Sequence, residues 1–255
     1  ACRVRVKDMA PRGFRLLNPS SMSEAVTVNR AYIERLAAEA RSFIAGEAGG
    51  GKVFVAVSGG IDSSVVLSLA VEALGSERVV AVYADTGMEF PASLETAERL
   101  ADKLGVELLI ARSSVDPFRE IRSRGLMTVE NRWCTRILKL APLARLYKRM
   151  GARIVADGAR ALESEGRAAT PRTGVNPLIP FVKRILPIHS WSRLEVQLYA
   201  HLKGLPVNPL YDMGLTRIGC IYCPAMHPHE VMISRGLHPQ FYRGLENVIG
   251  RRLKV

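Results

Sequence analysis

The 255-residue sequence contains no apolar run that approaches the roughly 20 residues a membrane helix needs. Its first residues, ACRVRVKDMAPRGF, also lack the apolar segment of a secretion signal. We therefore expect a cytoplasmic protein with no membrane partner. These residues alternate basic and apolar side chains, so we interpret residues 1–45 as a strand and helix extension, which could be the remnant of a preceding domain.

Acidic side chains and side-chain amides are both scarce. The chain has 24 Asp and Glu against 36 Lys and Arg, and its net charge is +12. This excess favours an anionic partner such as a nucleotide, a phosphate or a nucleic acid, although a solvated Arg-rich surface would give the same composition. With only six Asn and two Gln, the Arg-rich sequence is typical of a thermophile.

Short apolar runs alternate with helical patterns over most of the chain. The runs at 52–57, 78–84, 106–111 and 152–157 are typical of buried parallel strands. Helical patterns occur at 30–45, 64–74, 91–104 and 134–150. This order predicts an α/β, Rossmann-like open parallel sheet of about five strands, with helices on both faces and ligands at the carboxyl ends of the strands.

The pattern is looser after residue 158. The segment 161–180 is polar and rich in Pro and Gly, and we predict a mobile loop there. A helix is expected over 192–204, and a basic helical segment over 225–255. Residues 46–224 are then the main domain, which ends in a small cysteine-containing region.

The stretch SGGIDSS (58–64) lies between the first strand and its helix. Gly59 and Gly60 allow the backbone to approach a ligand closely, and Ser58, Ser63 and Ser64 supply hydroxyl groups. The free N–H groups of the first helical turn attract anions. Asp62 could cap the helix, hold Mg²⁺ or orient a ligand. The alternative interpretation is a tight turn that binds nothing.

Two other phosphate-binding motifs are excluded. GEAGGGKV (46–53) has Val where a Walker A loop needs Ser or Thr, and it precedes a strand. No G-x-G-x-x-G stands in the loop after the first strand.

SGGIDSS matches the S-G-G-x-D-S loop of the PP-loop, adenine nucleotide α-hydrolase-like superfamily. Four later segments resemble its PAPS/APS (phosphoadenosine and adenosine phosphosulfate) reductase branch in the same order: ADTGMEFPASLETAERLADKLG, RWCTRILKLAPL, DGARALESEGR and LPVNPLYDMGLTRIGCIYCP. The resemblance covers residues 52 to about 224.

The resemblance implies that the loop holds the phosphates of an adenine nucleotide, which is PAPS, APS or ATP. The nucleotide-binding candidates are Ser58, Gly59, Gly60, Asp62, Ser63, Ser64, Asp85, Thr86, Gly87, Lys139, Gly158, Arg160 and Arg167. The guanidinium groups of Arg160 and Arg167 suit phosphate or sulfate.

Three of the four cysteines, Cys134, Cys220 and Cys223, are candidate metal ligands, whereas Cys2 stands alone. Members of this family carry a [4Fe–4S] cluster on a Cys-Cys pair plus C-x-x-C, and here the pair is reduced to one cysteine. A three-cysteine cluster is our first interpretation. A zinc site completed by His227 or His229 is the second, and a metal-free C-x-x-C redox couple is the third.

The reductase mechanism needs a cysteine near the C-terminus, and no cysteine follows Cys223. The first hypothesis is nevertheless a PAPS-reductase-like oxidoreductase with a thioredoxin- or ferredoxin-like reductant. The second is an ATP-dependent sulfurtransferase that adenylates and thiolates a tRNA base. The third is a nucleotide- or RNA-binding module without catalytic activity. The candidate catalytic residues are Asp62, Arg160 and the three cysteines. The sequence leaves open whether the protein forms a homo-oligomer.

Overall fold

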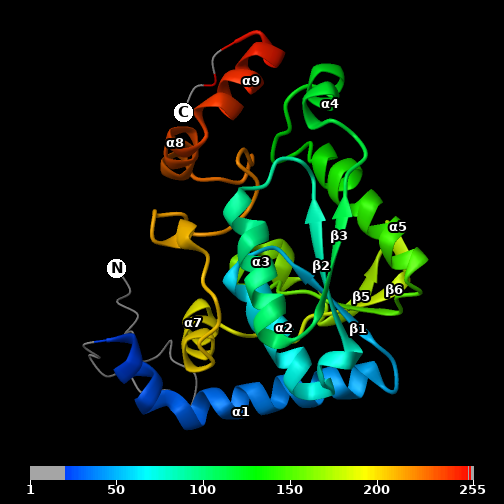
Figure 1. Cartoon of the computed structure of the whole chain (residues 1–255), viewed down its shortest axis with the longest axis vertical. Coiled ribbons are helices and arrows are strands. Elements are labelled where there is room, and N and C mark those ends of the chain that lie inside the picture. Colours follow the sequence, from blue (N-terminus) through cyan, green and yellow to red (C-terminus); the bar gives the residue numbers. More distant parts are fainter. Residues whose placement is uncertain (1–20, 252, 254–255) are drawn as a thin grey trace.

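The computed structural model describes residues 21–251 and 253. Its centre is a six-stranded sheet whose strand order is β3-β2-β1-β4-β6-β5. Five neighbouring strands are parallel, and only β5 runs antiparallel, against β6. The strands are β1 (Val53–Val57), β2 (Val79–Asp85), β3 (Glu107–Arg112), β4 (Ile154–Ala156), β5 (Thr173–Asn176) and β6 (Ile179–Ile185). The predicted open, mainly parallel α/β sheet is confirmed (Figure 1).

The apolar strands are buried because both faces of the sheet carry helices. One face packs against α1 (Met22–Ala48), α2 (Ile61–Leu74), α3 (Pro91–Leu104) and α7 (Arg193–Leu202). Val53 and Val55 point to this side and are fully buried. Phe54 points to the opposite side and meets Tyr147 edge to face, with ring centroids 6.1 Å apart. This alternation is what a strand covered on both faces requires.

α1 is longer than the predicted helix and belongs to the same core as the sheet. Ser21 caps its start, because its side chain accepts a hydrogen bond from the backbone N–H of Glu24. Its buried stripe packs mainly on α7 and α2. The predicted boundary at residue 45 falls inside this helix, and Cys2 lies outside the described residues. Within the described part of the chain, no helix is both long and apolar enough to cross a membrane.

Helix α5 (Ala141–Arg149) covers the second face, and a π-helical segment, η3 (Thr135–Leu140), leads into it. The helix predicted over 134–150 therefore exists, but its first part is wider than an α-helix.

The prediction of a mobile loop over 161–180 is wrong. A short turn, η4 (Ala161–Glu163), and one helical turn, α6 (Glu165–Ala168), are followed by the β5–β6 hairpin. The backbone of β5 pairs with β6 from Thr173 opposite Ile185 to Asn176 opposite Ile179. β5 is a short, partly exposed edge strand with few apolar residues, so its sequence resembles a loop.

The helical C-terminal region lies beyond the carboxyl ends of the central strands (Figure 1). Its helix α9 (Pro239–Ile249) packs on α4 (Pro117–Arg124) through Phe241 and Phe118, whose ring centroids are 5.3 Å apart. The elements not yet named are η2 (Ser76–Arg78), η5 (Pro209–Tyr211) and α8 (Pro228–Leu237).

Candidate functional site

The loop between β1 and α2 is held tightly by α3. Gly59 has φ +71°, and a Cβ built there would lie 2.2 Å from the backbone oxygen of Ser93. Glycine is therefore required both for the backbone conformation and for the close approach of α3. Gly60 is the N-terminal cap of α2 and has no side chain that could occupy the helix's free N–H groups. The N–H groups of Gly60 and Ile61 have side-chain acceptors, whereas those of Asp62 and Ser63 have no hydrogen-bond acceptor among the described residues, as in anion-binding loops.

The serine hydroxyls mainly fix the shape of this loop. Ser63 Oγ accepts a hydrogen bond from the backbone N–H of Ser58 at 3.1 Å and donates to the backbone oxygen of Gly60 at 2.8 Å. Ser64 Oγ donates to the same oxygen at 3.2 Å and is buried. Ser58 and Ser63 reach the wall of the adjoining cavity, whereas Ser64 does not.

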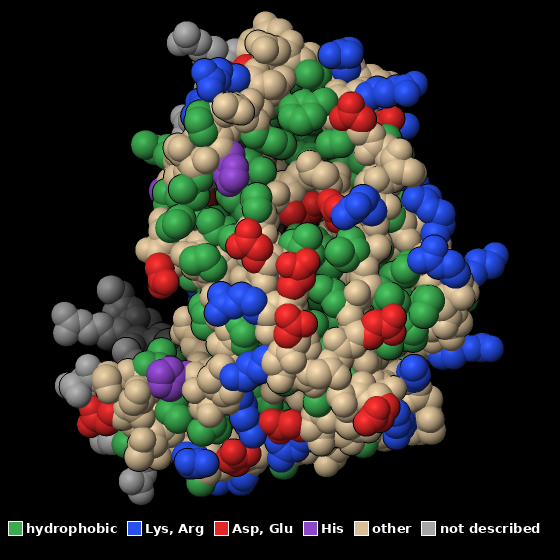
Figure 2. Space-filling model, viewed as in Figure 1, with side chains coloured by type: hydrophobic (Ala, Val, Ile, Leu, Met, Phe, Trp, Pro, Cys, Tyr) green, Lys and Arg blue, Asp and Glu red, His purple; other side chains and the backbone are tan. Residues whose placement is uncertain are grey.

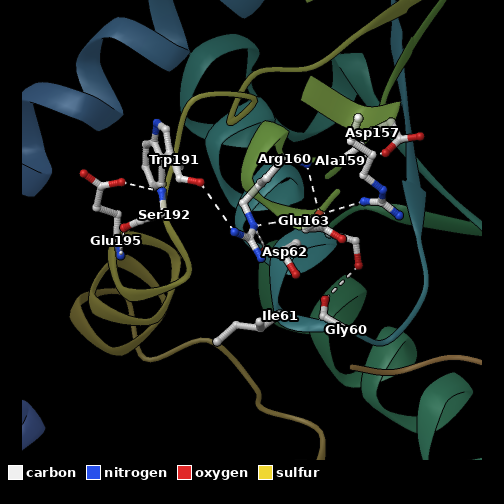
Figure 3. A network of polar contacts seen from close by, with 12 residues as sticks. Gly60, Ile61, Asp62, Asp157, Ala159, Arg160, Glu163, Trp191, Ser192 and Glu195 are labelled. Atoms are coloured by element: carbon white, nitrogen blue, oxygen red, sulfur yellow. Dashed lines mark hydrogen bonds and ion pairs between the residues drawn. The ribbon is translucent and has the colours of Figure 1, made fainter. Parts of the chain in front are cut away.

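A buried ion pair lies behind the start of α2. Arg160 Nε lies 2.5 Å from Asp62 Oδ1, and an Arg160 terminal nitrogen donates to the backbone oxygen of Trp191 at 3.5 Å (Figure 3). Burial raises the pKa of the Asp62 carboxyl, and the Arg160 charge opposes this only in part. Gly158 fits against this turn, because a Cβ there would lie 2.9 Å from the Ser63 backbone nitrogen.

A cavity of about 300 Å³ opens beside the loop, at the carboxyl ends of β1, β2 and β4. Its volume is near the lower end for small-ligand sites. Of the predicted residues, it is lined by Ser58, Gly60, Asp62, Ser63, Lys139, Gly158 and Arg167. Its inner wall is apolar and comes from α5 and β6, with Leu143, Tyr147 and Val182 among its residues.

Four cations line this cavity: Lys139, Arg167, Arg184 and Arg217. Only Arg167 has an ion pair in the described residues, at 2.6 Å from Glu163 Oε1, and the other three have no acidic partner there. The lining also carries the carboxylates of Asp62, Asp157 and Glu163. A cationic wall around free backbone N–H groups is suited to a phosphate chain.

Asp85, Thr86 and Gly87 form a separate turn that does not line the cavity. Asp85 accepts a hydrogen bond from the backbone of Gly87 and pairs with Arg112 at 2.8 Å. Thr86 donates from its backbone N–H and its hydroxyl to Glu89. These contacts close the turn on itself.

Cys134 and Cys220 lie beyond this turn, in an apolar cluster that also contains Ile121 of α4 and Leu245 of α9. Cys220 Sγ donates to Glu89 Oε1 at 3.7 Å, and the backbone of Ile221 pairs with Met88. Burial, followed by the nearby Glu89, raises the pKa of the Cys220 thiol, and burial also raises that of Cys134. Cys223 lies close enough to affect both electrostatically.

Whether these thiols bind a metal stays a prediction. No group of three or more His, Cys, Asp and Glu side chains in the described chain converges so that it could hold a metal ion. His227 and His229 stack on each other, with ring centroids 5.8 Å apart, and the backbone N–H of His227 donates to Glu230. None of the three cysteines lines the cavity.

Sequence reasoning missed several residues that shape the site. Tyr211 Oη accepts a hydrogen bond from the backbone N–H of Ile61 at 3.1 Å, in the first turn of α2. Asn208 donates to the backbone oxygen of Gly59 at 3.2 Å. Both lie in the LPVNPLYD segment that carries the family resemblance, which was the available signal. No sequence signal indicated Arg184, because the β5–β6 hairpin was not predicted.

This sheet, with a glycine- and serine-rich loop after its first strand and a cationic cavity at its carboxyl edge, defines a nucleotide-binding α/β protein of the PP-loop class. The phosphoadenosine phosphosulfate reductase domain model matches residues 52–226. The chain therefore belongs to the phosphoadenosine phosphosulfate reductase domain family.

Two relatives are uncharacterised proteins of Methanocaldococcus jannaschii. One is 35% identical over 199 residues, which are 77% of this chain and 41% of the relative, and the other is 30% identical over 76% and 46%. The chain thus spans less than half the length of either. A phosphoadenosine 5′-phosphosulfate reductase of Cronobacter sakazakii is 29% identical over 80% of this chain and 83% of the reductase.

Three solved structures share the fold. The PAPS reductase of Candida auris has a TM-score of 0.54 and 19% identity, over 75% of this chain and 95% of that one. FMN adenylyltransferase of Candida glabrata, bound to FMN and an ATP analogue, has a TM-score of 0.59 and 14% identity, over 84% of this chain and 69% of that one. The U34-tRNA thiolase of Methanococcus maripaludis, with its [4Fe-4S] cluster, has a TM-score of 0.50 and 18% identity, over 86% of this chain and 78% of that one.

Proposed function

We propose that the protein is a cytoplasmic enzyme that binds an adenine nucleotide with its phosphate chain on the 58–64 loop. The observation that carries this proposal is the cavity, which is lined by the 58–63 loop and by three cations that have no acidic partner in the described residues. Family membership supports the adenine nucleotide, since relatives carry the name PAPS or APS reductase.

We propose ATP as the nucleotide and adenylyl transfer as the reaction. An oxygen of the acceptor attacks the α-phosphorus, the bond from that phosphorus to the bridging oxygen breaks, and pyrophosphate leaves. The loop N–H groups with Lys139, Arg184 and Arg217 stabilise the charge on the departing pyrophosphate. Displacement of AMP from the acceptor by sulfide would then give a thiolated product, with a tRNA base as the candidate acceptor.

Mg²⁺ fits this site, because it commonly binds through one or two carboxylates and the phosphates of the substrate. Asp62 is the candidate, since its carboxyl group lines the cavity next to the loop and only one of its oxygens pairs with Arg160. When bound, Mg²⁺ would neutralise phosphate charge. The three thiols do not converge on one point in the described chain, so no step is assigned to an iron–sulfur cluster or to zinc.

Reductive cleavage of a sulfonucleotide is the second candidate, and family membership is what favours it. It requires a thiolate that attacks the bound sulfate group. The cysteines lie outside the cavity wall, and the raised pKa of Cys134 and of Cys220 disfavours the thiolate form. These two observations favour adenylyl transfer over sulfonucleotide cleavage.

Calorimetry with ATP, APS and PAPS tests the nucleotide, and product analysis tests the reaction. We expect ATP to bind and pyrophosphate to be released when unmodified tRNA is added. Sulfite release from APS or PAPS with a thiol reductant, without pyrophosphate release from ATP, would favour the second candidate. No binding of any of the three would contradict both.

A further inference from the structure

Most of the chain's positive charge lies in one continuous segment. Residues 112–153 contain eleven Lys and Arg against three Asp and Glu, a net charge of +8 out of +12 for the whole chain. We call these eleven side chains the basic face: Arg112, Arg119, Arg122, Arg124, Arg132, Arg136, Lys139, Arg145, Lys148, Arg149 and Arg153. The overall composition does not explain why so much of the positive charge lies in one sixth of the sequence.

All eleven side chains of the basic face belong to exposed residues. Only two of them form an ion pair in the described chain, Arg112 with Asp85 and Arg124 with Glu120. The other nine form no ion pair among the described residues, and their mutual repulsion costs stability at low salt. An anionic partner would remove that repulsion.

The basic face follows α4, η3 and α5 along one side of the molecule. In the view of Figure 1, α4 lies at the upper right and α5 lies below it at the right edge, and Figure 2 shows Lys and Arg side chains along that right-hand edge. On α5, Leu143, Leu146 and Tyr147 are buried against the sheet, and Arg145, Lys148 and Arg149 occupy the exposed side. Lys139 also lines the cavity, so the basic face reaches the proposed reaction site.

The composition of the basic face favours a phosphate backbone over an acidic protein. Nine of its eleven cations are Arg, whose planar guanidinium group matches phosphate oxygens with two hydrogen bonds. Protein interfaces depend on a central apolar cluster, and among residues 112–153 only Val129 and Met150 are exposed large hydrophobics. The segment also has no exposed aromatic side chain on which single-stranded bases would stack.

We propose that the basic face binds the helical phosphate backbone of a folded RNA and so presents an unpaired nucleotide of that RNA to the cavity. RNA is favoured over DNA because folded RNA places unstacked loop bases beside its helices, whereas duplex DNA keeps its bases paired. This inference rests on adenylyl transfer to a tRNA base as the proposed function, and it assigns the surface that would recognise that substrate.

The test compares two triple variants of the full chain that change net charge equally. The first is R145Q/K148Q/R149Q, on the exposed side of α5. The control is R30Q/R35Q/R99Q, at exposed residues of α1 and α3 with no ion pair in the described chain, and these two helices cover the face of the sheet opposite α5. Binding of a fluorescent, unmodified transfer RNA transcript is measured by anisotropy over a potassium chloride series, and a DNA duplex of matched charge is measured in parallel.

The α5 triple variant should weaken RNA binding at least about ten-fold and reduce the slope of log K against log salt by roughly two to three, the value for three lost phosphate contacts. The control should change the affinity by less than about three-fold and the slope by less than about one. Equal loss in both variants, or duplex DNA binding as tight as RNA binding, would overturn the proposal. An R119Q/R122Q variant on α4 gives an independent measurement if the α5 variant folds poorly.

ATP calorimetry on the same variants separates this inference from the proposed function. The α5 substitutions lie outside the cavity lining, so ATP affinity should be unchanged. Normal ATP binding without RNA binding would overturn only the proposal that the basic face binds RNA. RNA binding without ATP binding would contradict only the nucleotide proposal.

Discussion

Tyr211 accepts a hydrogen bond at 3.1 Å from the backbone N–H of Ile61, a residue 150 positions earlier in the chain. This N–H belongs to the first turn of α2, where backbone donors lack partners within the helix. The contact joins the segment after α7 to the phosphate loop and places a phenol in the cavity wall. Tyr211 therefore helps to fix the loop before any ligand binds.

Tyr211→Phe should keep the fold and lower the free energy of unfolding by about 0.5–1.5 kcal/mol, since it removes one mostly buried hydrogen bond. Urea unfolding followed by circular dichroism measures the change. Tyr222→Phe is the control, because no hydrogen bond of the Tyr222 hydroxyl is present in the described chain. Equal losses in the two variants would show that the Ile61 contact contributes nothing specific.

Asp62→Ala and Arg160→Ala should each weaken ATP binding by about 1.5–3 kcal/mol. Asp62 lines the cavity, whereas Arg160 is buried behind it and acts by holding the Asp62 carboxylate. The double variant should therefore lose little more affinity than either single variant. Calorimetry measures all three, and Arg124→Ala, in an exposed ion pair on α4, is the control. Additive losses would mean that Arg160 contributes by a separate route.

The strand-to-helix unit around the loop was predictable because its residues obey local rules. VFVAV must be buried, Gly59 and Gly60 permit the turn, and the helix beginning at Pro91 starts and ends as predicted. The β5–β6 hairpin was not predictable, since an exposed edge strand has no apolar alternation to recognise. The contacts of Tyr211 and Arg184 with the site depend on tertiary packing, and no local pattern encodes such packing. The hydrogen bonds of Asp85 and Thr86 within their turn and to Arg112 depend on packing in the same way, and a ligand contact of Asp85–Gly87 stays a prediction.

Gly59→Ala should destabilise the protein by more than Gly75→Ala. Both glycines have positive φ, +71° and +82°, so either substitution incurs the left-handed backbone cost of about 1–2 kcal/mol. A Cβ at Gly75 meets open space, whereas one at Gly59 would lie 2.2 Å from the Ser93 backbone oxygen. Chemical denaturation measures the difference, and Gly59→Ala should also abolish ATP binding. Equal destabilisation would show that α3 moves away without cost.

Glu230 should make the fold sensitive to acid. Its burial favours the neutral acid, but hydrogen bonds from the His227 backbone and from Thr216 outweigh burial and lower the pKa of the carboxyl group. A lowered pKa stabilises the fold above the unfolded value of about 4.3, and this stabilisation is lost as the pH falls through the folded value. Glu230→Gln should cost about 1.5–3 kcal/mol at neutral pH and progressively less below about pH 4. Urea unfolding at several pH values measures this, with the exposed Glu98→Gln as the control. A cost that does not change with pH would contradict the ionised state of Glu230.

Cys134 and Cys220 should react slowly with iodoacetamide. Burial raises the pKa of both thiols, and Glu89 opposes ionisation of Cys220 further. Because the thiolate is the reacting form, alkylation near pH 8 should be slower than that of free cysteine and should still increase above pH 9. Mass spectrometry of the digested protein gives the rate at each cysteine. Anaerobic incubation with iron and sulfide, or with zinc, separates the metal hypotheses, because a bound metal would protect all three cysteines together and only the cluster would colour the protein brown. Fast alkylation of Cys220 at neutral pH without metal would contradict its protonated state and would restore a sulfur nucleophile to the sulfonucleotide mechanism.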